Sequence, residues 1–415
     1  MSRTARTASA AVVVALTLGI SACGGSGGDD VAADSEQTLT VWAMGAEGEK
    51  LAEVADVYEK ANPNITVKVT PVGWDVAHQK LVSAAAAGTM PDVAQMGGTY
   101  MGEFAELGVL EPVDTKSFDK KDFFPAGWNQ GEVDGTAYGV PWYVDTRVLY
   151  YRTDLAEKAG VDKAPADWQE MRELATAYQE KAGTKWGLSI QPSGLDTVQN
   201  FSSFLYSAGG EILDDKGQAA IDSPEAVSAL KEYGSYFEKG LSNKSVQPGY
   251  DVVKDFGNGR VPMFLGGPWH VTLLNEGQPQ IKGKWAVAPV PAGKSSVSMA
   301  GGSSLVVSKD SEHKAAATKF IKYLTDTEGQ ADWYERTKDL PANTAAWDSG
   351  KLADDKDLQV FRKQMDTAKS SPSTAKLTEI TDKVDQAVAK VTQGKASAED
   401  ALKTAQSEIE GLVKQ

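Results

Sequence analysis

Two kinds of hydrophobic pattern alternate along the first hundred residues of the chain. Residues 39–42 and 65–72 are predicted as strands, and residues 47–61 carry apolar side chains at the i, i+3, i+4, i+7 spacing of a half-buried helix, namely Leu51, Val54, Ala55 and Tyr58. A second helix is predicted over residues 75–87 with Gly88 as its C-terminal cap, and another strand begins at residues 91–94. This order predicts an α/β lobe with a mostly parallel sheet, which binds ligands beyond the carboxyl ends of its strands.

The remainder of the chain is mixed at first and helical towards its end. Residues 138–151 form aromatic-rich extended segments, and helices are predicted near residues 168–182 and 224–239. From residue 310 onward the pattern is strongly helical, with Ser397 and Asp400 as a candidate capping pair for the last helix. No repeat of 20 to 50 residues is visible, which argues against solenoids and propellers.

Length and composition indicate a soluble globular protein of more than one domain. The 415 residues allow two or three domains at roughly 150 residues each. Hydrophobic residues make up 41% and charged residues 24%, so neither bulk disorder nor a multi-span membrane protein fits. The formal net charge of −15 repels phosphate backbones and anionic lipid surfaces, so no nucleic-acid partner is expected and a neutral or cationic ligand fits better.

The N-terminal residues have the pattern of a secretion signal followed by a tether. Arg3 and Arg6 precede an apolar run at residues 10–20, which is too short to span a bilayer comfortably. The sequence ISAC at residues 20–23 resembles the bacterial lipobox, and Cys23 is the only cysteine. A buried core thiol is the alternative, but the Gly/Ser/Asp stretch at residues 24–30 has no apolar side chain to pack against it.

We therefore expect cleavage of residues 1–22, lipidation of Cys23 and a flexible tether at residues 23–36. Cleavage removes two arginines and no acidic residue, which takes the net charge from −15 to −17. The mature protein is predicted to be an acidic domain on the extracytoplasmic face of the cell membrane, held through its N-terminal lipid.

The search for catalytic and metal-binding patterns gives no candidate. No two of the three histidines, His78, His270 and His313, have metal-ligand spacing. A G-x-S-x-G string at residues 24–28 lies in the tether, and a string resembling a phosphate loop at residues 288–295 lacks its first glycine and contains two prolines. Neighbouring acids such as Asp214 and Asp215 are typical of solvated turns. We expect no catalytic residue, no metal and no cofactor.

A set of short segments, weak one by one, is specific in order and spacing. These are LTVW at 39–42, GTMPDV at 88–93, FAELGVL at 104–110, YGVP at 138–141 with LYY at 149–151, MF at 263–264 with GPW at 267–269, GGS at 301–303, and the helix at 316–324. With them the chain resembles, over essentially its whole mature length, the extracellular solute-binding lipoproteins of bacterial ABC importers, in the sugar-binding group that includes the maltose-binding proteins.

The resemblance implies a periplasmic-binding-protein-like fold of two α/β lobes that close over a ligand. By similarity, the chain crosses between the lobes near residues 141–144, 298–301 and 340–341. The first lobe then combines residues 37–142 with 300–340, and the second combines residues 143–299 with 341–415.

The resemblance also implies where the ligand is bound. The family places an aromatic side chain against the sugar at the position of Trp269, which follows a Gly-Pro turn. Asp145 corresponds to a carboxylate that accepts hydrogen bonds from sugar hydroxyls, and Arg147 beside it is also a ligand-site candidate, although an ion pair between the two is an alternative. Glu47 lies where the family supplies a polar ligand contact, and a helix N-terminal acid is its alternative.

Further candidates are less specific. Trp74, Tyr100 and Trp142 follow strand-like segments and could contact the ligand or fill the core, whereas Trp42 lies within a strand and is expected to be buried. The polar residues Thr99 and Ser303 each follow a pair of glycines, which permits close approach of the backbone to a ligand. Gly302, the second glycine before Ser303, is a candidate for the same reason. The Trp-Tyr pair of the maltose-binding proteins is missing from residues 378–383, so Trp333, with Tyr334, is expected to supply rings instead.

These features lead to one functional hypothesis and two alternatives. The hypothesis is a monomeric binding lipoprotein, not an enzyme, that captures a sugar, an oligosaccharide or glycoside, and delivers it to the transmembrane subunits of an ABC permease. One alternative is a binding protein for another neutral solute, such as a sugar alcohol or a small peptide. The other is a surface-anchored carbohydrate-active enzyme, which would convert a glycan into product.

Overall fold

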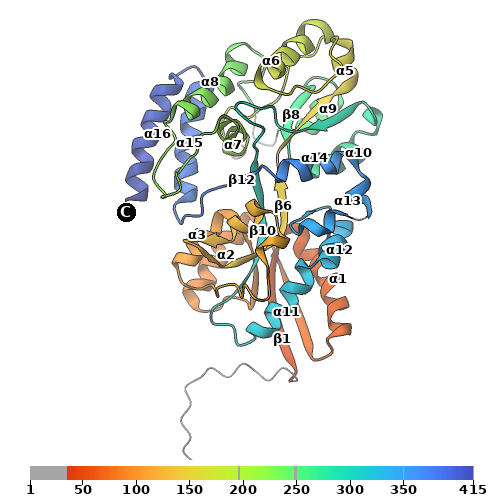
Figure 1. Cartoon of the computed structure of the whole chain (residues 1–415), viewed down its shortest axis with the longest axis vertical. Coiled ribbons are helices and arrows are strands. Elements are labelled where there is room, and N and C mark those ends of the chain that lie inside the picture. Colours follow the sequence, from red (N-terminus) through yellow and green to blue (C-terminus); the bar gives the residue numbers. More distant parts are fainter. Residues whose placement is uncertain (1–34, 195–196, 247–249, 349, 415) are drawn as a thin grey trace, which may run out of the picture.

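The computed structural model describes residues 35–194, 197–246, 250–348 and 350–414, and Figure 1 shows two lobes stacked along the long axis of the molecule. The signal sequence and Cys23 lie outside these residues. Among the helices that are described, none combines the length and the apolar composition needed to cross a lipid bilayer.

A seven-stranded sheet forms the centre of the lower lobe and continues between the lobes. Its order is β11-β6-β10-β3-β1-β2, and β12 also pairs with β10. The strands are β1 (Gln37–Met44), β2 (Ile65–Val72), β3 (Val93–Gly97), β6 (Gly139–Thr146), β10 (Met299–Val307), β11 (Leu340–Pro341) and β12 (Lys369–Ser370).

The direction of the strands agrees with the prediction only in part. β1 runs parallel to β2 and to β3, as the strand–helix alternation predicts. β10 runs antiparallel to both β3 and β6, and β11 runs antiparallel to β6. The sheet as a whole is therefore mixed, because strands from distant parts of the sequence insert next to the parallel ones.

The helices of the lower lobe begin and end close to the predicted positions. α1 (Gly45–Ala61) buries the side chains expected to face the core, including Leu51 and Tyr58, and α2 (Trp74–Ala87) ends at Gly88 in the left-handed conformation with φ 65°. Trp42 is partly buried, with Lys80 Nζ 4.3 Å from its ring centroid. The other helices are α3 (Gly98–Glu106), α4 (Pro125–Gln130), α11 (Lys314–Thr325) and α12 (Thr327–Thr337), and a small hairpin pairs β4 (Glu132–Val133) with β5 (Thr136–Ala137).

The upper lobe contains a three-stranded antiparallel sheet of order β8-β7-β9, surrounded by helices. The strands are β7 (Val148–Arg152), β8 (Met263–Gly266) and β9 (Trp285–Ala288). The helices are α5 (Thr153–Lys158), α6 (Trp168–Ala177), which continues into a π-helical turn at Tyr178–Ala182, α7 (Thr197–Ala208), α8 (Pro224–Glu238), α9 (Val252–Gly257), α10 (Trp269–Gly277), α13 (Gly350–Asp354), α14 (Lys356–Met365), α15 (Leu377–Thr392) and α16 (Ala398–Val413).

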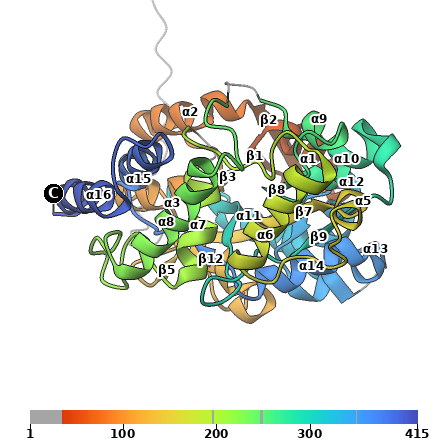
Figure 2. The same cartoon turned by 90° about the horizontal axis from the view of Figure 1, so that it is seen from above.

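Seen from above, α15 and α16 lie on one side of the molecule and α10 and α13 on the other (Figure 2). The predicted cap of α16 is confirmed, because Ser397 Oγ accepts a hydrogen bond from the Asp400 backbone N–H at 3.1 Å. Short 3₁₀ turns at Lys120–Asp122, Pro279–Ile281 and Thr344–Asp348 complete the described elements.

The three segments expected to cross between lobes are neighbouring strands of the central sheet. Val144 in β6 is paired with Gly302 in β10 on one side and with Leu340 in β11 on the other. Gly302 has φ 128°, a backbone conformation that favours glycine, and a side chain there would overlap the Tyr143 carbonyl oxygen.

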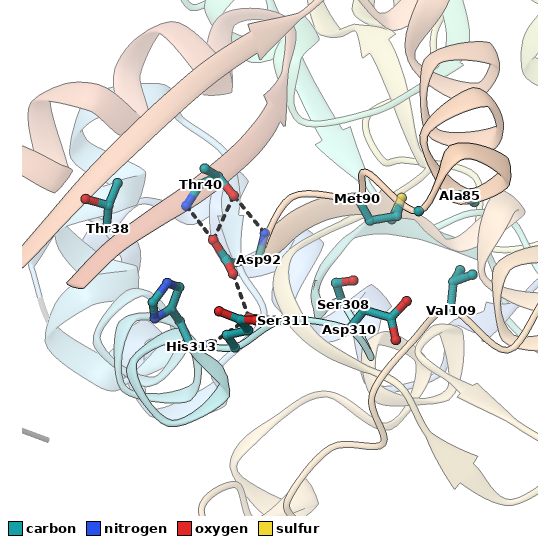
Figure 3. A pocket seen from close by; sticks show the side chains of 12 residues that line it. Thr38, Thr40, Ala85, Met90, Asp92, Val109, Ser308, Asp310, Ser311 and His313 are labelled. Carbon is teal, nitrogen blue, oxygen red and sulfur yellow. Dashed lines mark hydrogen bonds between the residues drawn. The ribbon is translucent and has the colours of Figure 1, made fainter. Parts of the chain in front are cut away.

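At the opposite end of the lower lobe, Asp92 ties three segments together (Figure 3). Its carboxylate accepts hydrogen bonds from the Thr40 backbone N–H at 2.8 Å, from the Thr40 hydroxyl at 2.7 Å and from the Ser311 hydroxyl at 2.6 Å. The middle of β1, the start of β3 and the turn after β10 are thus fixed together beside a hollow of about 430 Å³. This arrangement links three neighbouring interior strands of the sheet at the end where β3 begins.

Candidate functional site

A cavity of about 480 Å³ brings together residues from both lobes. The lower lobe contributes Glu47 from the first turn of α1 and Trp74 from the start of α2. Asp145 from the end of β6 and Trp269 from the start of α10 lie across from them. These four residues were predicted from the sequence, and the cavity they line lies beside β6 and β11.

The two tryptophans form apolar walls that rest on glycine backbones. Trp74 is 41% exposed and Trp269 is 42% exposed, although large aromatic side chains are usually much more buried. A Cβ at Gly45 would lie 2.8 Å from Cδ1 and Nε1 of Trp74, and one at Gly267 would overlap the Trp269 ring. Each indole is therefore backed by the protein and open to the cavity, which is the geometry of a preformed stacking surface.

Asp145 and Arg147 form a close pair behind Trp269. Arg147 Nη1 donates to Asp145 Oδ1 at 2.6 Å, and Nη2 donates to Gln199 Oε1. The guanidinium lies 4.7 Å from the centroid of the Trp269 ring. Arg147 is buried and does not line the cavity, whereas Asp145 does. The predicted alternative for Asp145, an ion pair with Arg147, is therefore present, and it leaves Asp145 at the cavity wall.

Glu47 is held by hydrogen bonds from the cavity wall. Its Oε1 accepts from the Tyr143 hydroxyl at 2.9 Å, and the Trp74 indole also hydrogen-bonds to its side chain. Burial raises the pKa of Glu47, while its own backbone N–H and these two donors act in the opposite direction. Tyr143 was not among the predicted residues, although it faces the same side of β6 as Asp145.

Asp339 is a third carboxylate of the cavity that the sequence did not indicate. Burial raises its pKa to about 7, and the negative charges of Glu47 and Asp145 act in the same direction. The neighbouring Lys338 lines the cavity, but its Nζ donates to the Glu335 carbonyl oxygen at 2.7 Å. Among the described residues no ion pair involves Glu47 or Asp339, so both retain acceptor oxygens for a ligand.

Besides Arg147, six predicted residues do not line this cavity. Trp142 is fully buried, and its ring centroid lies 4.4 Å from that of Trp333, which is also buried. Side chains alternate along β6, so Trp142 faces the core and Tyr143 faces the opposite side. Trp333 in α12 packs against Trp142 and is buried with it. Exposed Thr99 and half-buried Tyr100, which lies beside His78, are in the first turn of α3. Gly302 and buried Ser303 are in β10, and the Ser303 Oγ has no hydrogen-bond partner within the described part of the chain.

The residues that sequence reasoning missed are next to positions it selected. Asp339 and Lys338 precede the predicted crossing at 340–341, and Thr272 and Leu273 lie one turn of α10 after Trp269. Helical spacing from Trp269 and strand alternation from Asp145 were the signals that could have found Thr272, Leu273 and Tyr143. Over the four described ranges of the chain, no group of His, Cys, Asp and Glu side chains is arranged to hold a metal ion.

Comparison with known proteins gives consistent matches. The profile of the family described as bacterial extracellular solute-binding protein matches residues 43–331. The maltodextrin-binding protein MdxE of Bacillus subtilis is 28% identical over 380 residues, covering 86% of this chain and 85% of that protein. A maltooligosaccharide ABC transporter solute-binding lipoprotein of Streptococcus pneumoniae is 25% identical over 384 residues, covering 88% of each chain.

Among solved structures, the sugar-binding protein MalE from Xanthomonas citri superimposes with a TM-score of 0.86 at 33% identity. The match covers 91% of this chain and 97% of that chain, so both lobes are included.

Proposed function

The chain belongs to the family of bacterial extracellular solute-binding proteins, and we propose that it captures an oligosaccharide or glycoside in the cavity lined by Trp74 and Trp269 and delivers it to an ABC permease. It is a sugar-binding component of an ABC importer and not an enzyme. The specific class of sugar, the site residues and the anchoring are the proposal.

The observation that carries the proposal is the pairing of exposed indoles with carboxylates in one cavity. A sugar ring has flat C–H faces, which gain dispersion energy against aromatic rings, and hydroxyl groups, which donate hydrogen bonds to carboxylates. Trp74 and Trp269 supply the first kind of contact, and Glu47, Asp145 and Asp339 supply the second. A binding site of this kind needs a few placed polar groups between apolar walls.

The charge of the cavity supports a ligand without phosphate or carboxylate groups. Three acids and one basic residue, Lys338, line it; the Lys338 Nζ donates to the Glu335 carbonyl oxygen, and Arg147 is paired with Asp145. An anionic ligand would meet more acidic than basic side chains at short range, which is unfavourable in a partly buried site. A neutral sugar places only hydroxyl groups against these carboxylates.

Closure of the lobes is the proposed means of signalling that the ligand is bound. We assign residues 37–142 and 300–340 to the first lobe and residues 143–299 and 341–415 to the second, with crossings in β6, β10 and β11. A ligand that contacts residues from both lobes shifts the population toward the closed form. The permease then distinguishes the loaded protein from the empty one by its shape.

We further propose that the protein works as a monomer held at the extracytoplasmic face of the membrane by a lipid on Cys23. The lipobox and the spacer support this anchoring, and the pneumococcal relative is named a lipoprotein.

A sugar panel tests the proposed function. Thermal unfolding is measured with maltooligosaccharides, other disaccharides, sugar alcohols and short peptides, since a ligand at a hundred times its Kd adds about 2.7 kcal/mol of stability. We expect stabilisation by at least one glycan, which chromatography then recovers unchanged. Stabilisation by peptides alone would contradict the sugar proposal, and recovery of a cleaved glycan would indicate an enzyme.

A further inference from the structure

We propose that Tyr143 and Gln95 are positioning residues, which hold the Glu47 carboxylate in the orientation that accepts a hydrogen bond from the ligand. This inference rests on the proposed function, because it concerns the same cavity. Neither side chain needs to touch the sugar, and both act through Glu47.

A continuous chain of three hydrogen bonds links the sheet to Glu47. The Met44 backbone N–H donates to Gln95 Oε1 at 2.6 Å, Gln95 Nε2 donates to the Tyr143 hydroxyl at 3.2 Å, and that hydroxyl donates to Glu47 Oε1 at 2.9 Å. The chain connects the end of β1 and the middle of β3 and of β6 with the first turn of α1.

The direction of every donor in this chain is fixed. Gln95 is fully buried, and its carbonyl oxygen is occupied by the Met44 N–H, so its NH₂ group must face Tyr143. The Tyr143 hydroxyl accepts from that NH₂ group, and its own proton is therefore directed to Glu47. The Tyr143 hydroxyl accepts one hydrogen bond and donates another to a charged carboxylate. Each of these two hydrogen bonds strengthens the other, because each polarises the O–H group.

Local structure leaves few other restraints on the Glu47 side chain. α1 begins directly after β1, and its N-cap residue Met44 provides no side-chain cap. Besides the backbone, the side chain has hydrogen bonds from Tyr143 and from Trp74. Since Trp74 is itself a candidate ligand-stacking residue at the cavity rim, Tyr143 is the restraint that comes from inside the fold.

The surrounding charges make the hydroxyl important for the ionised state of Glu47. Burial raises the pKa of Glu47. The negative charge of Glu47 raises the pKa of Asp339, and the negative charge of Asp145 raises the pKa of both Tyr143 and Asp339. Lys338 is engaged with Glu335, and Arg147 with Asp145. Burial and these acids hold the pKa of Tyr143 well above its ordinary value, so the phenol keeps its proton and remains a donor.

The first experiment is a double-mutant cycle on the affinity for the sugar identified in the panel. Tyr143→Phe should weaken binding about tenfold, as the loss of a hydrogen bond to a charged group does. In a Glu47→Gln background the same substitution should weaken binding less than about twofold. Gln95→Met should weaken binding in wild type but have little further effect in Tyr143→Phe. Losses that add independently would overturn the inference.

Tyr178→Phe is the matched control. Like that of Tyr143, its hydroxyl donates one hydrogen bond, here to the Arg152 carbonyl oxygen at 2.9 Å, but Tyr178 lies in the upper lobe away from the cavity. We expect it to change stability as much as Tyr143→Phe does and to leave affinity unchanged. An equal affinity loss in both variants would mean that Tyr143 acts only through general stability.

A second experiment does not need a ligand. Titration of the Glu47 carboxyl by carbon NMR in the free protein should show a higher pKa in Tyr143→Phe than in wild type, and no change in Tyr178→Phe. If no sugar binds to wild type, the proposed function fails, and this titration still decides the positioning role. An unchanged Glu47 pKa in folded Tyr143→Phe would overturn it.

Discussion

The Arg147 guanidinium lies 4.7 Å from the centroid of the Trp269 indole, with the Asp145 carboxylate 2.6 Å from its Nη1. Arg147 is buried, whereas the indole is not, so one face of Trp269 is supported by a cation and the rest of the ring remains open to the cavity. A cation placed in this way is attracted to the ring face and thereby fixes the orientation of the aromatic side chain.

Replacement of Trp269 should therefore weaken binding without unfolding the protein. We expect Trp269→Ala to reduce the binding free energy for the sugar by about 2 kcal/mol or more, as the loss of an aromatic anchor does. Calorimetry measures the effect. Trp186→Ala is the matched control, since Lys185 lies 5.4 Å from that ring in a similar contact away from the cavity. Unchanged affinity in Trp269→Ala would remove this residue from the site.

The raised pKa of Asp339 predicts a specific dependence of stability on pH. In the folded protein the pKa of this carboxyl is about 7, whereas its ordinary value is 3.8, because it is buried near Glu47 and Asp145. Between these two values the folded state keeps a proton that the unfolded state has released, so the free energy of unfolding falls as pH rises from about 4 to about 7.

Asp339→Asn removes this effect and tests it. The variant should gain thermal stability relative to wild type as pH rises from 4 to 8, measured by unfolding at several pH values. Asp215→Asn, at an exposed turn, is the control and should follow wild type. A stability difference between Asp339→Asn and wild type that is constant across this range would contradict the assignment.

The elements of the lower lobe could be predicted because their signals are local. The spacing of Leu51 and Tyr58 and the cap at Gly88 depend only on residues within one or two turns, and the structure confirms them. The mixed character of the sheet could not be predicted in the same way. It arises where Ser304 pairs with Met96 and with Pro141, and no pattern within β10 indicates which distant strands will be its neighbours.

The candidate site shows a similar division. Glu47 and Trp269 follow from a strand end and a Gly-Pro turn, which the resemblance assigned to the ligand. Trp142 and Tyr143 are adjacent aromatic residues, and only one of them can share a face with Asp145. Alternation along β6 selects Tyr143, because it is two residues from Asp145, and sends Trp142 into the core. Asp339 has no such signal, since its exposure depends on how β11 pairs with β6.

The position of Trp142 gives a prediction that separates core packing from ligand contact. Because its ring packs against Trp333 in the core, Trp142→Phe should lower the free energy of unfolding by on the order of 1–2 kcal/mol. Affinity of the folded protein for the sugar should change by less than about twofold. Denaturant unfolding and calorimetry measure the two quantities. A large affinity loss at unchanged stability would return Trp142 to the ligand site.

The proposed anchor predicts where a cysteine variant is found in the cell. Cys23 follows Ile20-Ser21-Ala22 and is the only cysteine, so no other thiol can take the lipid. We expect Cys23→Ser to move the protein from the membrane fraction to the soluble extracytoplasmic fraction. Cell fractionation and immunoblotting measure this change. Ser21→Thr, a small change before the cysteine, serves as the control and should retain the anchor. Retention of Cys23→Ser in the membrane would contradict lipidation at this site.

Ligand-induced closure is the prediction that depends on the proposed crossings in β6, β10 and β11. Trp74 and Glu47 precede β6 in the sequence, whereas Trp269 follows it, and all three line one cavity beside β6 and β11. A sugar can contact both groups at once only when the lobes are close, so its differential affinity must favour the closed form.

Small-angle scattering with and without saturating sugar measures this closure. We expect the radius of gyration to decrease when the sugar is added, and to decrease less in Trp269→Ala at the same sugar concentration, because fewer molecules are loaded. Closure of the lobes should depend on β10, because Gly302 has φ 128°, a backbone conformation that other residues rarely adopt. If the free protein is open by this measurement and its radius of gyration stays constant at saturation, closure is excluded as the signal. The permease would then have to recognise the ligand or the cavity rim directly.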